Sequence, residues 1–509
     1  MKIKRLAIKN FRGYHGETSI EFEDLTAFVG KNDIGKSSIM EALDLFFNDG
    51  KGVIKLDKDD VNIDARGVED LEICISICFC DLPERIIIDA TNETSLAAEY
   101  LLNPNNQLEV IKKYPNAGSA KVFIRALHPT NPFCADLLQK RDSELRQIIE
   151  SNQIICDDRT RNAVMRNSIR QYFGDNLQLD IAEIDVTKGD TKSIWEKLQK
   201  YLPLYSLFQS DRKNSDGDNE VQDPLKEAVK EILHDEELQR VLNFVAATVE
   251  TKLREVSART LEKLREMSPD IASTLNPVIP VASSLKWGDV FKNVSITSDE
   301  NIPINKRGSG SKRLILLNFF RAEVERRQSE INAPSVIYAI EEPETSQHSE
   351  NQKKLIKALI LLAAANNTQV LITTHSATIV KQLGFNNIRI IRMDNTQKII
   401  ENTLPNQLPY PSLNEVNYLA FSELSEEYHN ELYGYIVEQG LLEEYSQDKS
   451  KTTYIRLLRN GVTRTEQKIM TEYIRHQIHH PENTHNVHFT ENDLRTSIED
   501  MRSFIQSKT

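Results

Sequence analysis

Hydrophobic and polar positions follow two different periods along the chain. The segment Lys2–Lys9 alternates basic and apolar residues, which is typical of a half-buried strand. Ile39, Ala42, Leu43 and Phe46 follow at helical spacing, which predicts a helix with one buried face. The chain therefore begins with strands and a helix in close succession.

The same alternation continues further along the chain. Strands are expected within 70–126 and again at 336–340, 370–374 and 387–393, and a helix is expected near 350–364. Short apolar strands that alternate with helices indicate a mixed, largely parallel sheet flanked by helices. The fold class is therefore predicted to be α/β.

Four regions follow from these patterns. The two lobes of one α/β head are expected at 1–126 and 275–403, because the sheet-forming sequence is split into two blocks. The stretch between them, 127–274, is charged and has apolar positions every three or four residues, which predicts a helical insertion. The last region, 404–509, is polar and helical, and it is expected to form an all-α C-terminal domain.

The composition is that of an ordinary globular chain. Hydrophobic residues make up 39% and charged residues 27% of the 509 residues. No run of about 18 apolar residues occurs, so no membrane span is expected. The basic N-terminal segment lacks the apolar region and cleavage site of a signal peptide, which favours a cytoplasmic location. A net charge of −13 argues against a protein that coats nucleic acid, although a local basic patch stays open.

Five cysteines occur, and Cys74, Cys78 and Cys80 lie in one apolar run. Alternation along a strand places these three on one face. A zinc site is one interpretation, but no His or Cys pair follows at finger spacing. Thiols buried in a core strand are favoured, and the odd number of cysteines points to a reducing compartment.

The segment Gly30–Ser37 fits the pattern G-x-x-x-x-G-K-[ST], with an apolar strand before it and a helix after it. Its glycines let backbone N–H groups face phosphates, and the helix N-terminus adds its dipole. Lys36 would reach the β- and γ-phosphates of ATP, and the Ser37 hydroxyl would join the Mg²⁺ shell. The residues expected to bind the nucleotide are Gly30, Lys31, Asn32, Asp33, Gly35, Lys36, Ser37 and Ser38.

Two acids, Glu341 and Glu342, stand at the end of an apolar strand. The carboxyl end of such a strand lies at the sheet edge that also carries the phosphate loop. We assign Glu341 to the metal and Glu342 to the attacking water. His375 directly follows the next strand, where it can bind the γ-phosphate or the water. A surface acid pair and a structural histidine are the alternatives for each motif taken alone.

A second loop of small residues precedes a helix at 307–328. Small residues before a helix start can also bind an anion. One nucleotide does not need two phosphate loops, so this loop is expected to contact ATP held by a partner chain. Its expected contacts are Ser309, Gly310 and Lys312.

In this order, the motifs resemble an ABC-type ATPase head. The opening strand and the segment A-I-E-E-P-E at 339–344 are similar to the RecF, SMC and OLD-like branch. Asn10, Phe11 and Arg12 match that branch's nucleotide-edge turn, which implies that Arg12 contacts ATP. Glu341 stands where many ABC proteins have Asp, and the OLD-like branch often has Glu there. The Q-loop glutamine of the class is not placed.

The resemblance covers about 1–126 and 275–395 and implies two heads that meet head to tail, in a homodimer or a larger homo-oligomer. The insertion, too short for a long coiled-coil arm, is expected to serve dimerisation or docking.

OLD-family nucleases carry a Toprim domain, which needs a Glu and a downstream Asp-x-Asp pair to hold metal. No Asp-x-Asp occurs after residue 395. A separate nuclease of HNH or Toprim type is therefore an expected partner.

Arg475 and His480 fit the spacing R-[NDH]-x-x-x-H, which resembles the HEPN ribonuclease motif. Arg475 could bind a scissile phosphate, and His480 could act as general acid or base on an RNA 2′-hydroxyl. A histidine-rich helix end, or a degenerate HEPN-like docking domain, would explain the same residues.

Three functions fit these motifs. The first, which the sequence favours, is the ATPase subunit of a bacterial anti-phage defence system that controls a nuclease effector in its own tail or in a partner protein. The second is a RecF- or SMC-like DNA-repair ATPase, which would need a basic groove and contact with nucleic acid. The third is a HEPN-type ribonuclease toxin gated by ATP.

Overall fold

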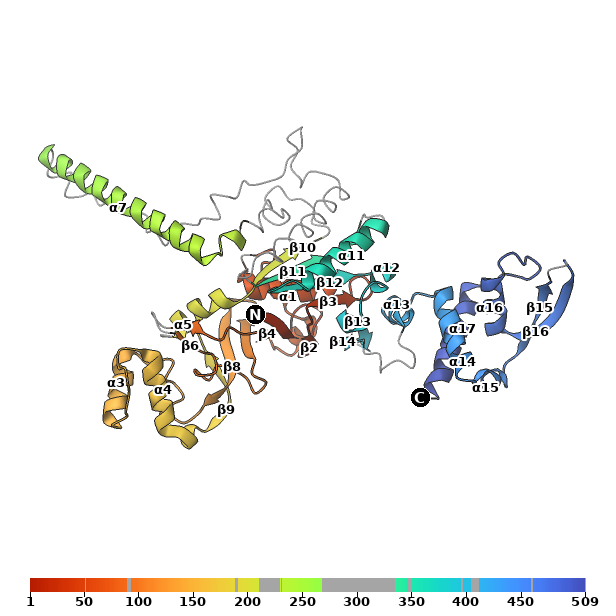
Figure 1. Cartoon of the computed structure of the whole chain (residues 1–509), viewed down its shortest axis with the longest axis horizontal. Coiled ribbons are helices and arrows are strands. Elements are labelled where there is room, and N and C mark those ends of the chain that lie inside the picture. The colour runs from red at the N-terminus through yellow and green to blue at the C-terminus, as the bar shows by residue number, and fades with distance from the viewer. Residues whose placement is uncertain are drawn as a thin grey trace.

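Two six-stranded sheets form the head, and a long helix and a separate tail project from it (Figure 1). The structure is a computed structural model that describes residues 1–50, 52–88, 93–187, 191–209, 229, 231–267, 335–345, 349–394, 397–403, 412–458 and 461–508. The second anion-binding loop, with Ser309, Gly310 and Lys312, lies outside the described residues.

The first sheet is antiparallel throughout and belongs to the N-terminal lobe. In spatial order its strands are β2 (Thr18–Glu21), β1 (Lys2–Lys9), β4 (Glu72–Cys80), β7 (Leu108–Pro115), β8 (Lys121–Pro129) and β9 (Leu179–Asp185). The strands expected within 70–126 are confirmed by β4, β7 and β8.

In strand β4, the isoleucines and the cysteines lie on opposite faces. Its isoleucines are fully buried, whereas Cys74, Cys78 and Cys80 alternate with them and share the opposite face, as expected. Burial raises the pKa of the Cys74 thiol to about 11, so that thiol stays protonated at neutral pH. Within the described ranges, no cluster of three or more His, Cys, Asp or Glu side chains could hold a metal ion.

The second sheet joins both sequence blocks. In spatial order its strands are β10 (Leu204–Phe208), β11 (Val336–Glu341), β12 (Thr368–Thr374), β3 (Leu25–Val29), β13 (Ile388–Asp394) and β14 (Gln397–Asn402). All neighbours are parallel except β13 and β14. The predicted strands near 336, 370 and 387 are confirmed, and β3 from the N-terminal block lies between two of them.

Helices cover this sheet. Helix α1 (Lys36–Asn48) packs between the two sheets, because its buried residues join a core that contains side chains from both. Helix α11 (Ser349–Ala363) confirms the helix predicted near 350–364 and packs on β12. The short elements of the chain are η1 (Lys58–Asp60), α2 (Ile63–Gly67), β5 (Ile86–Ile87), β6 (Glu93–Thr94), η2 (Gly174–Leu177), η3 (Gln199–Tyr201), α12 (Ala377–Val380) and η6 (Phe385–Asn387).

The stretch 127–274 contains the expected helices and, in addition, the strands β9 and β10. Its helices are α3 (Asp142–Ser151), α4 (Asn162–Phe173), α5 (Thr191–Leu198) and α7 (Glu236–Met267). Both strands pair at the edge of a sheet; β9 is mostly exposed, whereas four of the five residues of β10 are buried. The insertion therefore completes the two sheets as well as adding helices.

A buried ion triad ties α4 to the N-terminal lobe. Arg166 Nη2 lies 2.7 Å from Glu99 Oε1, and Arg170 Nη1 lies 2.8 Å from Glu99 Oε2. Burial alone would raise the pKa of Glu99, but the two guanidinium groups lower it. The carboxylate is therefore ionised and anchors the helix.

The tail forms its own core. It contains α13 (Leu413–Phe421), α14 (Glu426–Glu438), α15 (Leu442–Ser446), β15 (Lys451–Leu457), β16 (Thr463–Ile469), α16 (Met470–His479) and α17 (Glu491–Gln506). The region is mainly helical, as expected, and it also carries the antiparallel hairpin β15–β16, which the sequence did not predict. Over the described residues, no helix has the length and apolar character needed to cross a membrane.

Candidate functional site

The segment Gly30–Ser37 forms a tight loop between β3 and α1. Asp33 and Gly35 have positive φ angles of 60° and 107°, which turn the backbone into the helix. Gly30 presses against β13, since a Cβ there would lie 2.6 Å from the Ile391 carbonyl oxygen. Among the described residues, no side chain caps α1 and no acid lies in its first turn. The backbone N–H groups of that turn thus suit an anion.

Lys36 is almost fully buried within this loop. Its Nζ donates hydrogen bonds to the carbonyl oxygens of Gly30 (2.7 Å) and Lys31 (2.8 Å). Burial lowers the pKa of Lys36, while the carboxylates of Glu342 and Glu344 act in the opposite direction. The acids that follow β11 are therefore close enough to act electrostatically on the lysine.

Strand register explains this proximity. Glu341 pairs with Thr373 of β12, and Thr374 pairs with Val29 at the end of β3. The carboxyl ends of three parallel strands thus meet at one edge, with the phosphate loop beginning one residue later. The structure brings the predicted loop together with the acid pair and His375, although the loop precedes them by more than 300 residues in the sequence.

Glu342 is held in an unusual backbone conformation. Its φ is 41°, and its N–H donates to the Thr373 carbonyl oxygen at 3.0 Å. Its Oε1 lies 3.3 Å from His375 Nδ1. Positive φ is uncommon for a non-glycine residue and is found at active sites, where the surroundings hold it in place. The side chain is partly exposed and is oriented toward the histidine.

Glu344 is a site residue that the sequence reasoning missed. Its Oε1 accepts hydrogen bonds from Thr374 Oγ1 (2.7 Å) and from the His375 N–H (3.0 Å), and it lies 3.4 Å from His375 Nδ1. The side chain is only 5% exposed. The segment E-E-P-E contains this third acid, which could have been found from its spacing. His375 Nδ1 therefore faces two carboxylates, which leaves Nε2 for another contact.

Arg12, expected at the nucleotide, faces two acids. Its Nε donates to Asp60 Oδ1 at 2.8 Å, and its Nη1 forms an ion pair with Glu41 Oε2 of α1. Asn62 Nδ2 donates to the Arg12 carbonyl oxygen at 2.6 Å and fixes the turn. The positive charge of Arg12 is thus offset within the chain.

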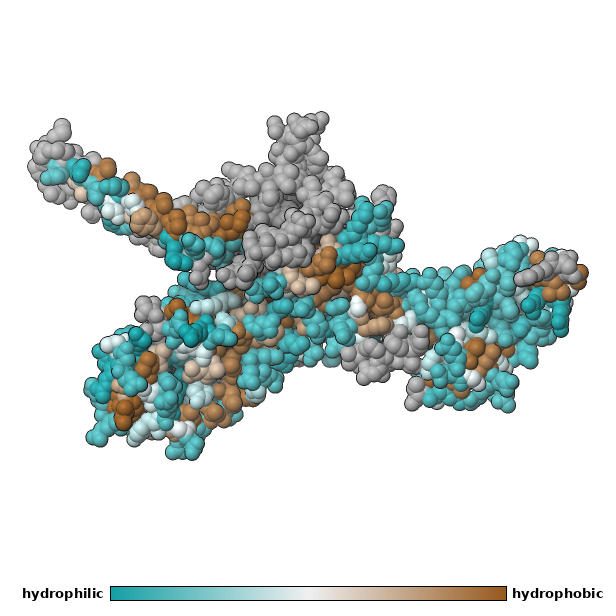
Figure 2. Space-filling view, viewed as in Figure 1, coloured by the Kyte–Doolittle hydropathy of each residue, from teal (hydrophilic) through white to brown (hydrophobic). Residues whose placement is uncertain are grey.

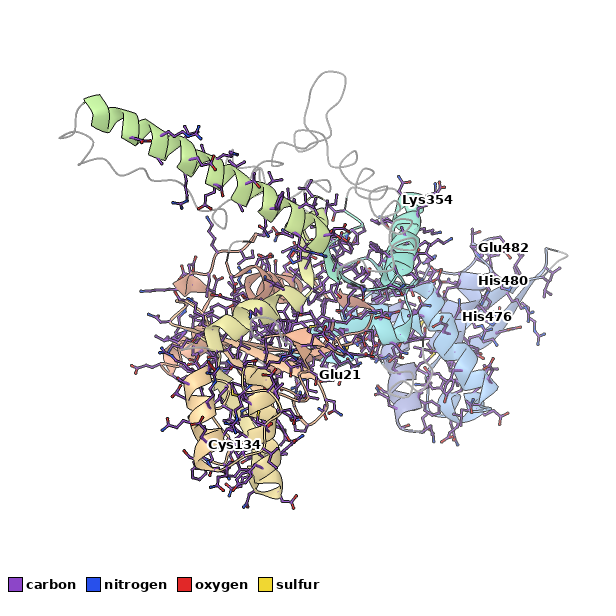
Figure 3. All side chains as sticks on the ribbon, turned by 60° about the vertical axis from the view of Figure 1, so that its left-hand side comes forward. Glu21, Cys134, Lys354, His476, His480 and Glu482 are labelled. Carbon is purple, nitrogen blue, oxygen red and sulfur yellow. The ribbon has the colours of Figure 1, made fainter. Side chains whose placement is uncertain are left out.

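The tail residues Arg475 and His480 do not converge in one chain. The Arg475 guanidinium stacks on the Tyr433 ring at 4.2 Å. His480 lies instead beside His476 and Glu482, with 3.2 Å between its Nδ1 and Glu482 Oε1 (Figure 3). Arg475 lies inside α16, whereas His480 follows the last residue of the helix in a non-helical conformation. Their predicted ribonuclease role stays a prediction.

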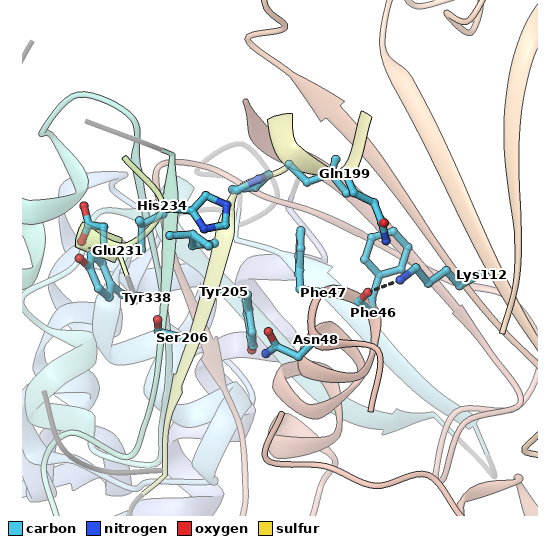
Figure 4. A pocket seen from close by; sticks show the side chains of 14 residues that line it. Phe46, Phe47, Asn48, Lys112, Gln199, Tyr205, Ser206, Glu231, His234 and Tyr338 are labelled. Carbon is cyan, nitrogen blue, oxygen red and sulfur yellow. Dashed lines mark hydrogen bonds between the residues drawn. The ribbon is translucent and has the colours of Figure 1, made fainter. Parts of the chain in front are cut away.

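A cavity of about 260 Å³ lies at the opposite end of α1 (Figure 4). Phe47 stacks on Tyr205 at its wall, and Lys112 Nζ donates to the Phe46 carbonyl oxygen at 2.7 Å. The 13 residues of α1 span about 20 Å at 1.5 Å per residue, so this cavity is remote from the phosphate loop. It is not part of the nucleotide site.

The residues at the strand edge fit ATP with Mg²⁺. The uncapped helix start and Lys36 suit phosphates, and Ser37 is exposed at the beginning of α1. Glu341, only 7% exposed, supplies the carboxylate that a hard cation needs. This donor set is of the kind that nucleotide phosphates and a hard cation need.

Two known nucleases are similar in sequence to this chain. It is 22% identical over 456 residues to endonuclease GajA of Bacillus cereus (strain HuB5-5), covering 79% of this chain and 62% of that protein. It is 21% identical over 406 residues to the OLD nuclease of Thermus scotoductus, covering 78% of this chain and 63% of that protein. The chain thus spans less than two thirds of either relative.

Solved structures of SMC heads are also similar. The SMC head domain from Thermotoga maritima matches with a TM-score of 0.33 and 13% identity, covering 79% of this chain and all of that one. An SMC head bound to the C-terminal winged-helix domain of ScpA matches with a TM-score of 0.37 and 15% identity, covering 79% of this chain and 97% of that one.

The family profile described as AAA ATPase domain matches residues 1–380. Because this is well over half of its length, the chain belongs to the AAA ATPase domain family.

Proposed function

We propose that two copies of this chain hydrolyse ATP at shared sites and that the ATP state controls a nuclease effector in bacterial defence against phage. The contact of His375 Nδ1 with Glu342 and Glu344, next to Lys36, carries this proposal. A buried lysine for phosphates and a carboxylate–histidine pair are the parts that phosphoryl transfer to water requires.

The phosphate loop binds and orients the nucleotide. Lys36 exchanges its two backbone carbonyl contacts for the β- and γ-phosphates, while the N–H groups of α1 hold the phosphate oxygens. Ser37 and Glu341 would hold Mg²⁺, which neutralises phosphate charge when bound.

Glu342 and His375 act on the attacking water. Glu342 accepts a hydrogen bond from the water and orients it, and its position is fixed by the N–H bond to Thr373. His375 Nδ1 lies beside both carboxylates, 3.3 Å from Glu342 Oε1 and 3.4 Å from Glu344 Oε1, so its Nε2 can contact the γ-phosphate or the water. Glu344 positions the imidazole through its bonds to Thr374 and to the His375 backbone.

A second chain is proposed to complete each site through Ser309, Gly310 and Lys312. The helix α7 supports pairing, because an apolar stripe runs along it (Figure 2). The exposed apolar residues of this stripe are Val241, Phe244, Val245, Val249, Leu253 and Val256. Burying such a stripe against a second copy would remove apolar surface from water.

The nuclease part of the proposal is supported by the relatives, both of which are named nucleases. The chain spans less than two thirds of the length of each relative. We propose a nuclease of HNH or Toprim type as the effector that ATP binding or hydrolysis controls.

The variant Glu342→Gln tests the site. We expect the rate of ATP hydrolysis to fall by about 100-fold to 10,000-fold, because the water loses its proton acceptor. ATP should stay bound, and pairs of chains should accumulate. ATPase assays, nucleotide retention and light scattering with ATP measure these three effects. The matched control is Glu350→Gln on the exposed surface of α11, which should change none of them. Normal hydrolysis by Glu342→Gln would remove the assignment.

A further inference from the structure

Lys398 of β14 lies directly against the phosphate loop. Its Nζ would be 2.0 Å from a Cβ at Gly13 and 3.0 Å from a Cβ at Gly35, so both glycines leave room for it. Nζ also lies 5.6 Å from the centre of the Tyr14 ring, and the Tyr14 hydroxyl donates to the Gly35 carbonyl oxygen at 3.1 Å. The lysine thus fills the space between the N-terminal turn and the loop.

Lys398 has no carboxylate partner within the described parts of the chain. Its ammonium group forms no ion pair there and lies over the Tyr14 ring. Arg12 in the same turn differs, because Asp60 and Glu41 neutralise it. Burial lowers the pKa of Lys398, with no opposing charge. A half-buried cation beside an uncapped helix start favours a bound anion.

The position of Lys398 also indicates which part of the nucleotide it meets. In the sheet, β13 and β14 lie on one side of β3, whereas β12 and β11 lie on the other. Glu342 and Glu344 raise the pKa of Lys36, whereas among the described residues burial alone shifts the pKa of Lys398. Glu342 and Glu344 lie at the end of the phosphate loop where the γ-phosphate is expected to react. Lys398 approaches the phosphate loop from its opposite end.

We propose that Lys398 is a second cation of the ATP site and binds the phosphate chain of the same nucleotide from its ribose side, at the α-phosphate. The proposal rests on the ATP site described above. Lys36 and Lys398 then hold the phosphates from both flanks of β3. Gly13 has a specific role in this arrangement, because a side chain there would occupy the position of the Lys398 ammonium group.

The first experiment compares Lys398→Ala and Lys398→Arg in the full-length protein. ADP and ATP both contain the α-phosphate. Lys398→Ala should therefore lower the binding affinity for ATP and for ADP by a similar factor, about tenfold for one lost charge-assisted contact. Lys398→Arg should retain most of the affinity. Lys353→Ala, an exposed lysine on α11, is the matched control and should bind as the unchanged protein does. Titration calorimetry with ATP and ADP measures each dissociation constant.

The second experiment places a methyl group where the lysine lies. Gly13 is outside the left-handed region, and the three atoms nearest to its added Cβ all belong to Lys398, so Gly13→Ala should displace that side chain first. We expect Gly13→Ala to weaken nucleotide binding as Lys398→Ala does. The double variant should bind no more weakly than either single variant, because both remove one contact.

The outcomes separate this proposal from the ATP site itself. Unchanged affinity in Lys398→Ala, with normal binding by the parent protein, would overturn the role of Lys398 and leave the site intact. A loss confined to ATP would place the contact at the γ-phosphate and overturn the assignment to the ribose side. If the parent protein binds neither nucleotide, the proposed ATP site and this inference both fail.

Discussion

Two histidines show how differently the head and the tail use the same side chain. His375 lies at a strand end, 41% exposed, with Nδ1 beside two carboxylates and Nε2 available for a further contact. His429 is completely buried among α14 and α17, and its Nε2 lies 3.0 Å from Ser497 Oγ. The first is arranged to meet a ligand and the second to join helices.

The surroundings of each histidine extend this difference. In the tail, Ser497 donates to Thr471 Oγ1 and Tyr445 lies 2.9 Å from the same oxygen, so these hydroxyls form a buried hydrogen-bonded chain next to His429 Nε2, while His429 Nδ1 has no hydrogen-bond partner among the described residues. At the head, the carboxylates face Lys36 and an uncapped helix start. Polar groups that satisfy one another stabilise a fold, whereas polar groups at an open strand edge are available for chemistry.

The largest expected effect comes from Lys36→Ala. Removal of the buried ammonium group should lower ATP affinity by about 100-fold, because two charge-assisted contacts to phosphates are lost. Binding of a fluorescent ATP analogue measures this change. Arg475→Ala in the tail serves as the control and should leave affinity unchanged. Tight ATP binding by Lys36→Ala would contradict the comparison, since the head would then not be the ligand-binding region.

Acid should affect the tail through His429. Burial, with a smaller contribution from Arg475, lowers the pKa of His429 to about 4. The unfolded chain takes up a proton near pH 6.5, so the stabilising contribution is present above pH 6.5 and is lost as the pH falls toward 4. The loss is at most about 3.4 kcal/mol, because the two pKa values differ by about 2.5 and each pKa unit corresponds to 1.36 kcal/mol.

Hydrogen exchange of α14 and α17 between pH 7 and 4.5, corrected for the intrinsic rate, measures this loss in the whole protein. His429→Gln keeps a hydrogen-bonding side chain that does not titrate, so its local stability should depend less on pH. An equal pH dependence in both proteins would show that another group destabilises the tail in acid.

The sequence predicted the head better than the tail, and the reason is physical. The phosphate loop, Glu342 and His375 each follow an apolar strand, and parallel register brings such strand ends to one edge. The role of Lys398 was not predicted. The lysine lies on β14, and only the strand order of the folded sheet shows that β14 comes close to the phosphate loop. The hairpin β15–β16 was missed because most of its side chains are polar and exposed, which leaves no strand pattern.

The smallest effect is expected from His480→Ala. His480 is more than half exposed, and Arg475 faces Tyr433, so a single chain does not assemble the predicted ribonuclease pair. ATP turnover should change less than about twofold, since an exposed ion pair contributes little. Cleavage of a labelled RNA, with and without ATP, should be the same for the variant and the parent protein. If the parent cleaves RNA and His480→Ala does not, two chains must combine Arg475 of one with His480 of the other, and the tail would then be a second catalytic region.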